Sequence, residues 1–136
     1  MHPKNLTIAL AGNPNSGKTT IFNIITGTRQ KVGNWPGVTV AKKEGRIHKF
    51  GYDLKIIDLP GTYSLTPYSI EEIVARNYVL DERPDVVVDI IDASNLERSL
   101  YLATQLRELD CKVLFALKMA DLARTRGMKI DADKLS

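Results

Sequence analysis

Short apolar runs alternate along the chain with longer segments in which apolar residues recur at helical spacing. The short runs have the length and β-branched content of buried strands, and they lie at 6–11, 54–58, 86–91 and 113–117. The longer segments predict helices at 19–26, 70–80, 96–109 and 121–126. Strands that alternate with helices in this way predict a doubly wound α/β sheet, mostly parallel, with helices on both faces.

Local residues set the expected boundaries of these elements. Gly27 is expected to end the first helix, and Ser69 followed by two glutamates is typical of the start of another. The segment 40–50 is predicted to be an exposed strand that turns at 51–53 and pairs with 54–58. The segments 28–39 and 59–68 show little periodicity, and we predict that both are loops. In the helix at 96–109, the residues expected on the buried face are Leu100, Ala103, Leu106 and Leu109.

The segment between the first strand and the first helix carries the pattern G-x-x-x-x-G-K-[ST] of a phosphate-binding P-loop. Its glycines let several backbone N–H groups point toward phosphate oxygens, and the following helix adds its positive N-terminal end. Lys18 can reach the β- and γ-phosphates, and the Thr19 hydroxyl can bind Mg²⁺. The alternative is a chance match in a turn, which the flanking strand and helix disfavour. The residues that we assign to nucleotide binding here are Gly12, Asn13, Pro14, Asn15, Ser16, Gly17, Lys18, Thr19 and Thr20.

A second motif, D-x-x-G, runs from Asp58 to Gly61 at the end of a predicted strand. Asp58 can hold Mg²⁺ and its water shell, and the Gly61 N–H can contact a γ-phosphate. Taken alone, such a stretch is often only a turn. About forty residues after a P-loop and at the carboxyl edge of a strand, it indicates the phosphate and magnesium side of a nucleotide site.

The predicted loop between these motifs offers a further Mg²⁺ ligand. Thr39 is our choice, and Thr28 is the less favoured alternative. We place Gly33 and Trp35 with the catalytic loop as well. Trp35 has an alternative role as a structural anchor, and anchoring does not exclude a gating role.

A third motif, Lys118-Met119-Ala120-Asp121, follows the predicted strand at 113–117. GTPases carry N-K-x-D or N-x-x-D at this place, and the aspartate accepts two hydrogen bonds from the guanine edge. Asp121 fits this pattern, whereas Lys118 stands where asparagine is expected and cannot accept a hydrogen bond. The motif favours guanine over adenine, although Asp121 can also be an ordinary helix cap.

Composition limits the classes of function. A length of 136 residues and 43% hydrophobic content are typical of a single soluble domain, and no apolar run is long enough to span a membrane. A net charge of +3 is too small to indicate nucleic-acid binding, and a single cysteine excludes a disulfide framework within the chain. Asp89, Asp92 and Glu97 are scattered acids that we expect to be solvated, not to form an iron site.

The motifs together resemble the N-terminal G domain of the FeoB family of bacterial ferrous-iron transport proteins. The segments that carry the resemblance are 12–19, 32–40 (VGNWPGVTV), 58–72 (beginning DLPGTYS) and 92–102 (DASNLERSLYL). The resemblance implies GTP hydrolysis, coupled to Fe²⁺ passage through a membrane domain, at the cytoplasmic face of the inner membrane. Family members continue into a last G-domain strand, a helical domain and transmembrane helices. We therefore expect a truncated G domain, and its self-association stays open.

The resemblance also implies a K⁺-assisted mechanism. Asn15 and backbone groups of residues 33–37 would hold the ion beside the phosphates, in the place of an arginine finger; Asn15 also suits a simple turn. Thr62 stands where many GTPases have a water-orienting glutamine, so turnover is expected to be slow. Two other interpretations stay open: a nucleotide-gated module that barely hydrolyses, and a GTPase of ribosome or tRNA maturation, for which a basic appendage is missing.

Overall fold

The computed structural model describes residues 4–14 and 16–118 and contains one six-stranded sheet with helices on both faces. The strand order is β2-β3-β4-β1-β5-β6. The strands are β1 (Lys4–Gly12), β2 (Gln30–Asn34), β3 (Ala41–Lys49), β4 (Tyr52–Asp58), β5 (Val86–Asp92) and β6 (Val113–Lys118). The helices are α1 (Lys18–Thr26), α2 (Ile70–Glu82), the 3₁₀ turn η1 (Ala93–Asn95) and α3 (Leu96–Glu108). The predicted α/β architecture is confirmed.

Strand β1 lies at the centre of the sheet and pairs in parallel with β4 on one side and β5 on the other. Ala9 is opposite both Ile57 and Val87, and β6 extends the parallel part beyond β5. The carboxyl ends of these strands therefore meet at one edge. This edge is where an open α/β sheet binds its ligands.

Strand β2 corrects the predicted loop at 28–39. Gln30 to Asn34 pairs antiparallel with β3, with Gln30 opposite Gly45 and Asn34 opposite Ala41. Most of β2 is solvent-exposed, so neither face of this edge strand needs apolar residues. Sequence periodicity reports burial of one face, and an edge strand with both faces in water has no such signal.

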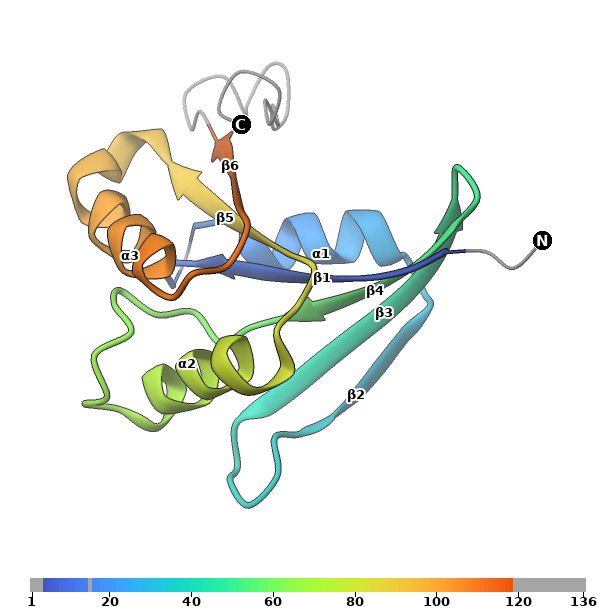
Figure 1. Cartoon of the computed structure of the whole chain (residues 1–136), viewed down its shortest axis with the longest axis horizontal. Helices are drawn as coiled ribbons and strands as arrows, with labels where there is room; N and C mark the ends of the chain where they lie inside the picture. Colours follow the sequence, from blue (N-terminus) through green and yellow to red (C-terminus); the bar gives the residue numbers. More distant parts are fainter. Residues whose placement is uncertain (1–3, 15, 119–136) are drawn as a thin grey trace.

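Alternating residues of the central strands pack into hydrophobic clusters on opposite faces of the sheet. Ala9 and Val87 pack with residues of α2 and α3, whereas Leu10 packs with Phe22 of α1. Figure 1 shows α1 and α2 on opposite sides of β1 and β4. Burial on both faces explains why these strands are nearly continuous in apolar residues.

The buried face of α3 differs from the prediction by about one position. Leu100 is 48% exposed, and the buried residues are Ser99, Leu102, Ala103 and Leu106. The predicted and the observed buried faces share positions 103 and 106. Apolar spacing alone does not distinguish one face from the other. A serine on the buried stripe is the detail that the periodicity missed.

The start of α2 is the one that the sequence predicts. Ser69 caps the helix, with its hydroxyl accepting from the Glu72 N–H at 3.2 Å and donating to the Glu72 carboxylate at 2.9 Å. This reciprocal arrangement satisfies a backbone donor that the helix itself leaves free. The cap fixes where the segment after β4 ends.

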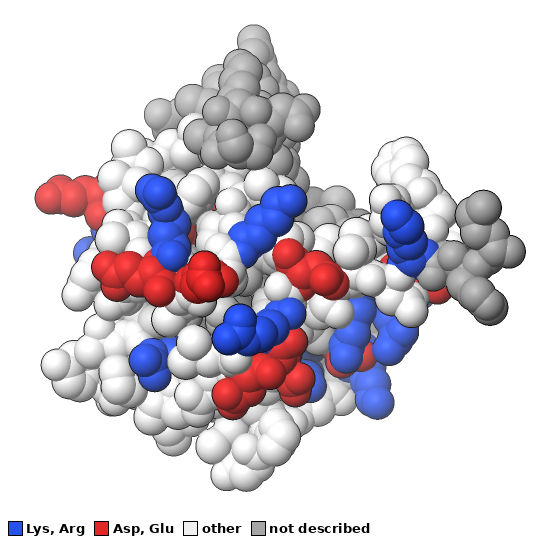
Figure 2. All heavy atoms as spheres, in the orientation of Figure 1, with Lys and Arg blue, Asp and Glu red and all other residues white. Residues whose placement is uncertain are grey.

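The surface in Figure 2 carries lysine and arginine interspersed with aspartate and glutamate. This face therefore offers no broad patch of one sign of the kind that binds nucleic-acid phosphates. Among residues 4–14 and 16–118, no helix is both long enough and apolar enough to cross a bilayer.

Gly45→Ala is expected to lower the free energy of unfolding by about 1–3 kcal/mol, because other atoms already fill the space that the added Cβ would need. A Cβ at Gly45 would lie 2.7 Å from Cβ of the buried Thr26 at the end of α1. Chemical denaturation measures the loss. Gly33→Ala is the matched control on the neighbouring strand, since no described atom lies within 4 Å of its added Cβ. Equal stability of the two variants would contradict this packing.

Candidate nucleotide-binding site

The P-loop has the backbone that its sequence predicts. Strand β1 ends at Gly12 and α1 begins at Lys18, with Gly17 between them in the left-handed region at φ 90°. An alanine at Gly12 would place its Cβ 2.8 Å from Ser16 Oγ and 3.0 Å from the Ile90 carbonyl oxygen. Both glycines are therefore required by the turn that brings the strand into the helix.

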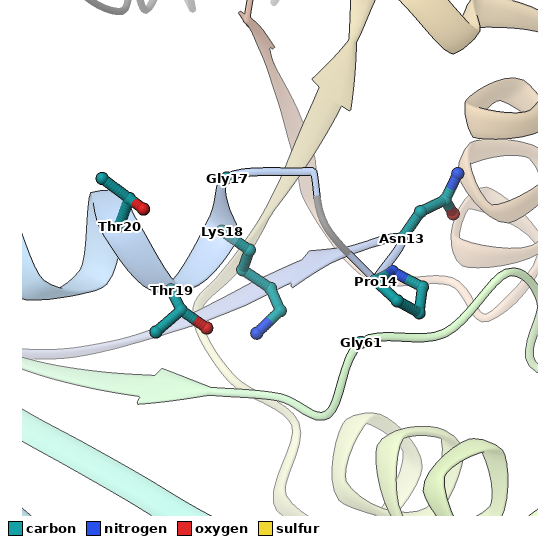
Figure 3. A pocket seen from close by; sticks show the side chains of 7 residues that line it. All are labelled: Asn13, Pro14, Gly17, Lys18, Thr19, Thr20 and Gly61. Atoms are coloured by element: carbon teal, nitrogen blue, oxygen red, sulfur yellow. The ribbon is translucent and has the colours of Figure 1, made fainter.

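A cavity of about 320 Å³ opens beside this turn. Figure 3 shows the residues that line it: Asn13, Pro14, Gly17, Lys18, Thr19, Thr20 and Gly61. All seven are residues to which the sequence assigned a nucleotide-binding role. The cavity lies against the N-terminus of α1, where unpaired N–H groups and the helix dipole favour an anion.

Lys18 and Thr19 line this cavity, and Asp58 contacts both of them from outside its lining. The Lys18 ammonium forms an ion pair with Asp58, and each residue is only 6% exposed. Thr19 Oγ1 lies 3.5 Å from the other Asp58 carboxylate oxygen. A hydroxyl beside a carboxylate is the oxygen donor set that Mg²⁺ prefers, so these two residues fit the ion.

The segment after β4 packs directly on the P-loop. The Leu59 N–H donates to the Leu10 carbonyl and the Thr62 N–H to the Gly12 carbonyl, both at 3.0 Å. A Cβ at Gly61 would lie 3.1 Å from Pro14 Cα. A side chain at position 61 would therefore push the two loops apart, which explains glycine in the D-x-x-G motif.

Three predicted residues of the 28–39 segment lie outside the cavity lining. Trp35 is buried, with its ring edge-on to Tyr78 at 5.5 Å and the Lys42 ammonium 4.8 Å from the ring centroid. Thr39 and Gly33 are exposed. Thr28, the alternative to Thr39, is exposed as well. Trp35 thus anchors the β2–β3 connection on α2.

The three scattered acids occupy separate environments. Asp89 is 1% exposed, and among the described residues its Oδ2 finds no hydrogen-bond partner. Burial raises its pKa to about 7, so the expectation that it is solvated is wrong. Asp92 accepts the Ser94 N–H at 3.0 Å, and Glu97 is exposed. Within 4–14 and 16–118, no group of three or more histidine, cysteine or acidic residues is placed to hold a metal.

Several predicted site residues lie outside the described part of the chain. They are Asn15, Met119 and Asp121; β6 ends at Lys118. The predictions of a K⁺ contact and of guanine contacts therefore stay predictions.

Two polar residues of α3 contact the loops of the site and were missed. Asn13 Nδ2 donates to Ser99 Oγ at 3.4 Å, and the Gln105 side chain bonds to the segment after β4. For Ser99, a signal was available. Ser99 lies at helical spacing from Leu102 and Leu106. This spacing indicates that Ser99 is on the buried face of the helix, where a polar side chain needs a partner.

Comparison with known proteins assigns the family. The family model of ferrous iron transport protein B matches residues 6–136. The chain belongs to this family. The Fe(2+) transporter FeoB of Salmonella typhimurium is 51% identical, over 98% of this chain and 18% of that protein. FeoB of Escherichia coli K12 is 50% identical with the same coverage. The chain thus spans about a fifth of the length of these FeoB relatives.

Solved FeoB structures share the fold. The G domain of the T. maritima FeoB iron transporter superposes with a TM-score of 0.84 at 48% identity, covering 96% of this chain and 80% of that one. A variant of S. thermophilus NFeoB bound to GDP has a TM-score of 0.81 at 55% identity, covering 95% and 50%. The resemblance to FeoB drawn from the motifs is confirmed.

Proposed function

We propose that this chain binds GTP and GDP at the P-loop cavity and hydrolyses GTP slowly, as the G domain of a ferrous-iron transporter. The observation that carries the proposal is that Lys18 and Thr19 line the cavity beside the N-terminus of α1 and that Asp58 contacts both of them. The GDP-bound relative of the same fold supports the choice of a guanine nucleotide.

Phosphate binding rearranges the ion pair. Lys18 exchanges the Asp58 carboxylate for the β- and γ-phosphate oxygens, while N–H groups of the P-loop turn point at the same anion. Asp58 and Thr19, with Thr39 as a further ligand, are then free to hold Mg²⁺. When bound, this ion neutralises charge on the β- and γ-oxygens.

Hydrolysis in this site relies on positioning and charge. The described residues that line the cavity include no acid and no histidine, so no side chain there serves as a general base. Gly61 contributes its N–H to the γ-phosphate. Asn15 and the backbone of 33–37, with Trp35 anchoring that segment, would hold K⁺, which would supply the positive charge that an arginine supplies in other GTPases.

Base selection falls to the segment from Lys118 to Asp121. Asp121 accepts two hydrogen bonds from guanine. Lys118 supplies no acceptor where asparagine is expected, so affinity for the base is weakened by about 1–3 kcal/mol relative to an asparagine at this position. Lys118→Asn should therefore lower the Kd for GDP, and an equal Kd in the two proteins would contradict this role.

The FeoB relatives are named Fe(2+) transporters, and this chain matches about a fifth of their length. We infer that it works as part of a longer protein, with helical and transmembrane domains as its partners, at the cytoplasmic face of the cell membrane. Fe²⁺ is then the substrate of the membrane part.

A second candidate is a nucleotide-gated interaction module with negligible hydrolysis. The absence of an acid or histidine among the described cavity residues favours it. The D-x-x-G segment would then change its contacts with a partner according to the nucleotide bound.

Phosphate release from GTP and ATP, each with Mg²⁺ in KCl and in NaCl, separates the two candidates. We expect slow release from GTP, about tenfold or more faster in K⁺ than in Na⁺ because an added cation stabilises the transition state. Release from ATP should be much slower, since Asp121 selects guanine. Equal rates in the two salts would overturn the K⁺ role, and bound GTP without release would favour the module.

A further inference from the structure

Helix α3 contacts both loops that form the phosphate cavity. Toward the P-loop, the buried Ser99 hydroxyl accepts a hydrogen bond from Asn13, which lines the cavity and is itself 6% exposed. Toward the segment after β4, Arg98 lies over the Tyr63 ring at 5.2 Å. The two loops are therefore braced by one rigid element.

The most specific of these contacts is made by Gln105. Its Oε1 accepts the backbone N–H of Leu65, and its Nε2 donates to Thr66 Oγ1 at 3.1 Å. One side-chain amide thus uses both its acceptor and its donor on consecutive residues of the same segment. The Leu65 side chain, 4% exposed, packs in the core with Leu106 of α3.

The held segment begins only a few residues after the cavity wall. A Cβ added at Gly61 would lie 3.1 Å from Pro14 Cα, and the Thr62 N–H donates to the Gly12 carbonyl, so this stretch is fixed on the P-loop side. Gln105 fixes it at the other side, at Leu65 and Thr66. Gly61 lies between the attachments of Leu59 and Thr62 to β1, and Gln105 holds the stretch that follows, so Gln105 limits how far the Gly61 N–H can move.

We propose that Gln105 is a positioning residue that sets the preference of the site for guanosine triphosphate over diphosphate. The proposal rests on the proposed function. A diphosphate is held by the P-loop alone, whereas a third phosphate also needs the N–H of Gly61. Loss of the Gln105 hydrogen bonds releases the segment and costs the triphosphate more than the diphosphate.

The test measures dissociation constants of fluorescent GDP and of a non-hydrolysable GTP analogue, with Mg²⁺, for the whole chain. Gln105→Met keeps the length of the side chain and removes both bonds. At about 1 kcal/mol per hydrogen bond, the ratio of the analogue's Kd to that of GDP should rise about tenfold or more. The Kd of GDP itself should stay within about twofold.

Two further variants distinguish positioning from a general effect on α3. Gln105→Glu should keep the unaltered ratio, because a carboxylate accepts from both the Leu65 N–H and the Thr66 hydroxyl. Thr104→Ala, an exposed neighbour on α3, should also keep it. A Gln105→Met chain that fails to fold is replaced by Thr66→Val, which removes one bond from the loop side and should raise the ratio about fivefold.

An unchanged ratio in Gln105→Met, or in Thr66→Val where that variant replaces it, overturns the role of Gln105. An equal rise in Gln105→Glu or in Thr104→Ala overturns it too. If GDP binding persists in those cases, the proposed function stands. Failure of the unaltered chain to bind guanine nucleotide overturns both.

Discussion

Replacing Asp89 with asparagine will raise the free energy of unfolding at pH 8 by on the order of 2–4 kcal/mol. Asp89 lies in β5 between β1 and β6, opposite Ala11 and Phe115, and is 1% exposed. Burial without a charged partner raises the pKa of its carboxyl to about 7. The folded protein therefore keeps a proton that the unfolded chain gives up near pH 4.

The sign of the pH dependence follows from this difference. Between pH 4 and pH 7 the folded state binds more protons than the unfolded state, so stability falls as pH rises. Above about pH 7 the folded carboxyl ionises as well, and the loss levels off near its full size. In Asp89→Asn this contribution disappears, and stability should be nearly flat across the same window.

Urea denaturation at pH 4.5, 6 and 8 checks the prediction. Asp81→Asn is the matched control, because it removes the same charge from an exposed position of α2. In the control, the free energy of unfolding should change with pH as it does in the unaltered protein. If the free energy of unfolding of Asp89→Asn changes with pH as much as that of the control, Asp89 is not the group that titrates.

Lys18→Met will weaken GDP binding by about 100-fold and also destabilise the empty protein by about 3 kcal/mol. The first effect is the loss of the ammonium that contacts the phosphates. The second arises because Asp58, 6% exposed, loses its ion-pair partner and is left as a buried charge. Binding and stability therefore fall together in this single variant.

The double variant Lys18→Met with Asp58→Asn separates the two effects. Removing both charges leaves no unpaired carboxylate, so most of the stability should return, as is common when a whole buried pair is replaced. GDP affinity should stay low, since neither the phosphate contact nor the Mg²⁺ ligand is restored. Full recovery of binding in the double variant would contradict the assignment of Lys18.

Patterns that report burial and backbone geometry could be predicted from the sequence. The central strands were predicted because both of their faces are covered, as Ala9 and Leu10 illustrate. The P-loop was predicted because Gly12 and Gly17 occupy positions that only glycine fits. The residues that line the phosphate cavity followed from these two motifs.

Features that depend on a three-dimensional neighbour were missed. Strand β2 is held by its pairing with β3, and its exposed residues carry no period. Gln105 meets Leu65 and Thr66 across 40 and 39 residues, and nothing local to α3 indicates that contact. Asp89 was expected to be solvated, yet its place within the apolar run 86–91 was a signal that the sheet would bury it.

We propose that the cavity beside Lys18 and Asp58 is a guanine-nucleotide site. Calorimetric titration of GDP with Mg²⁺ tests it most directly, with ADP as competitor and the double variant as control. We expect saturable 1:1 binding of GDP that ADP does not displace, with an affinity about 100-fold lower in the double variant. Equal binding of GDP to the unaltered chain and the double variant would contradict it.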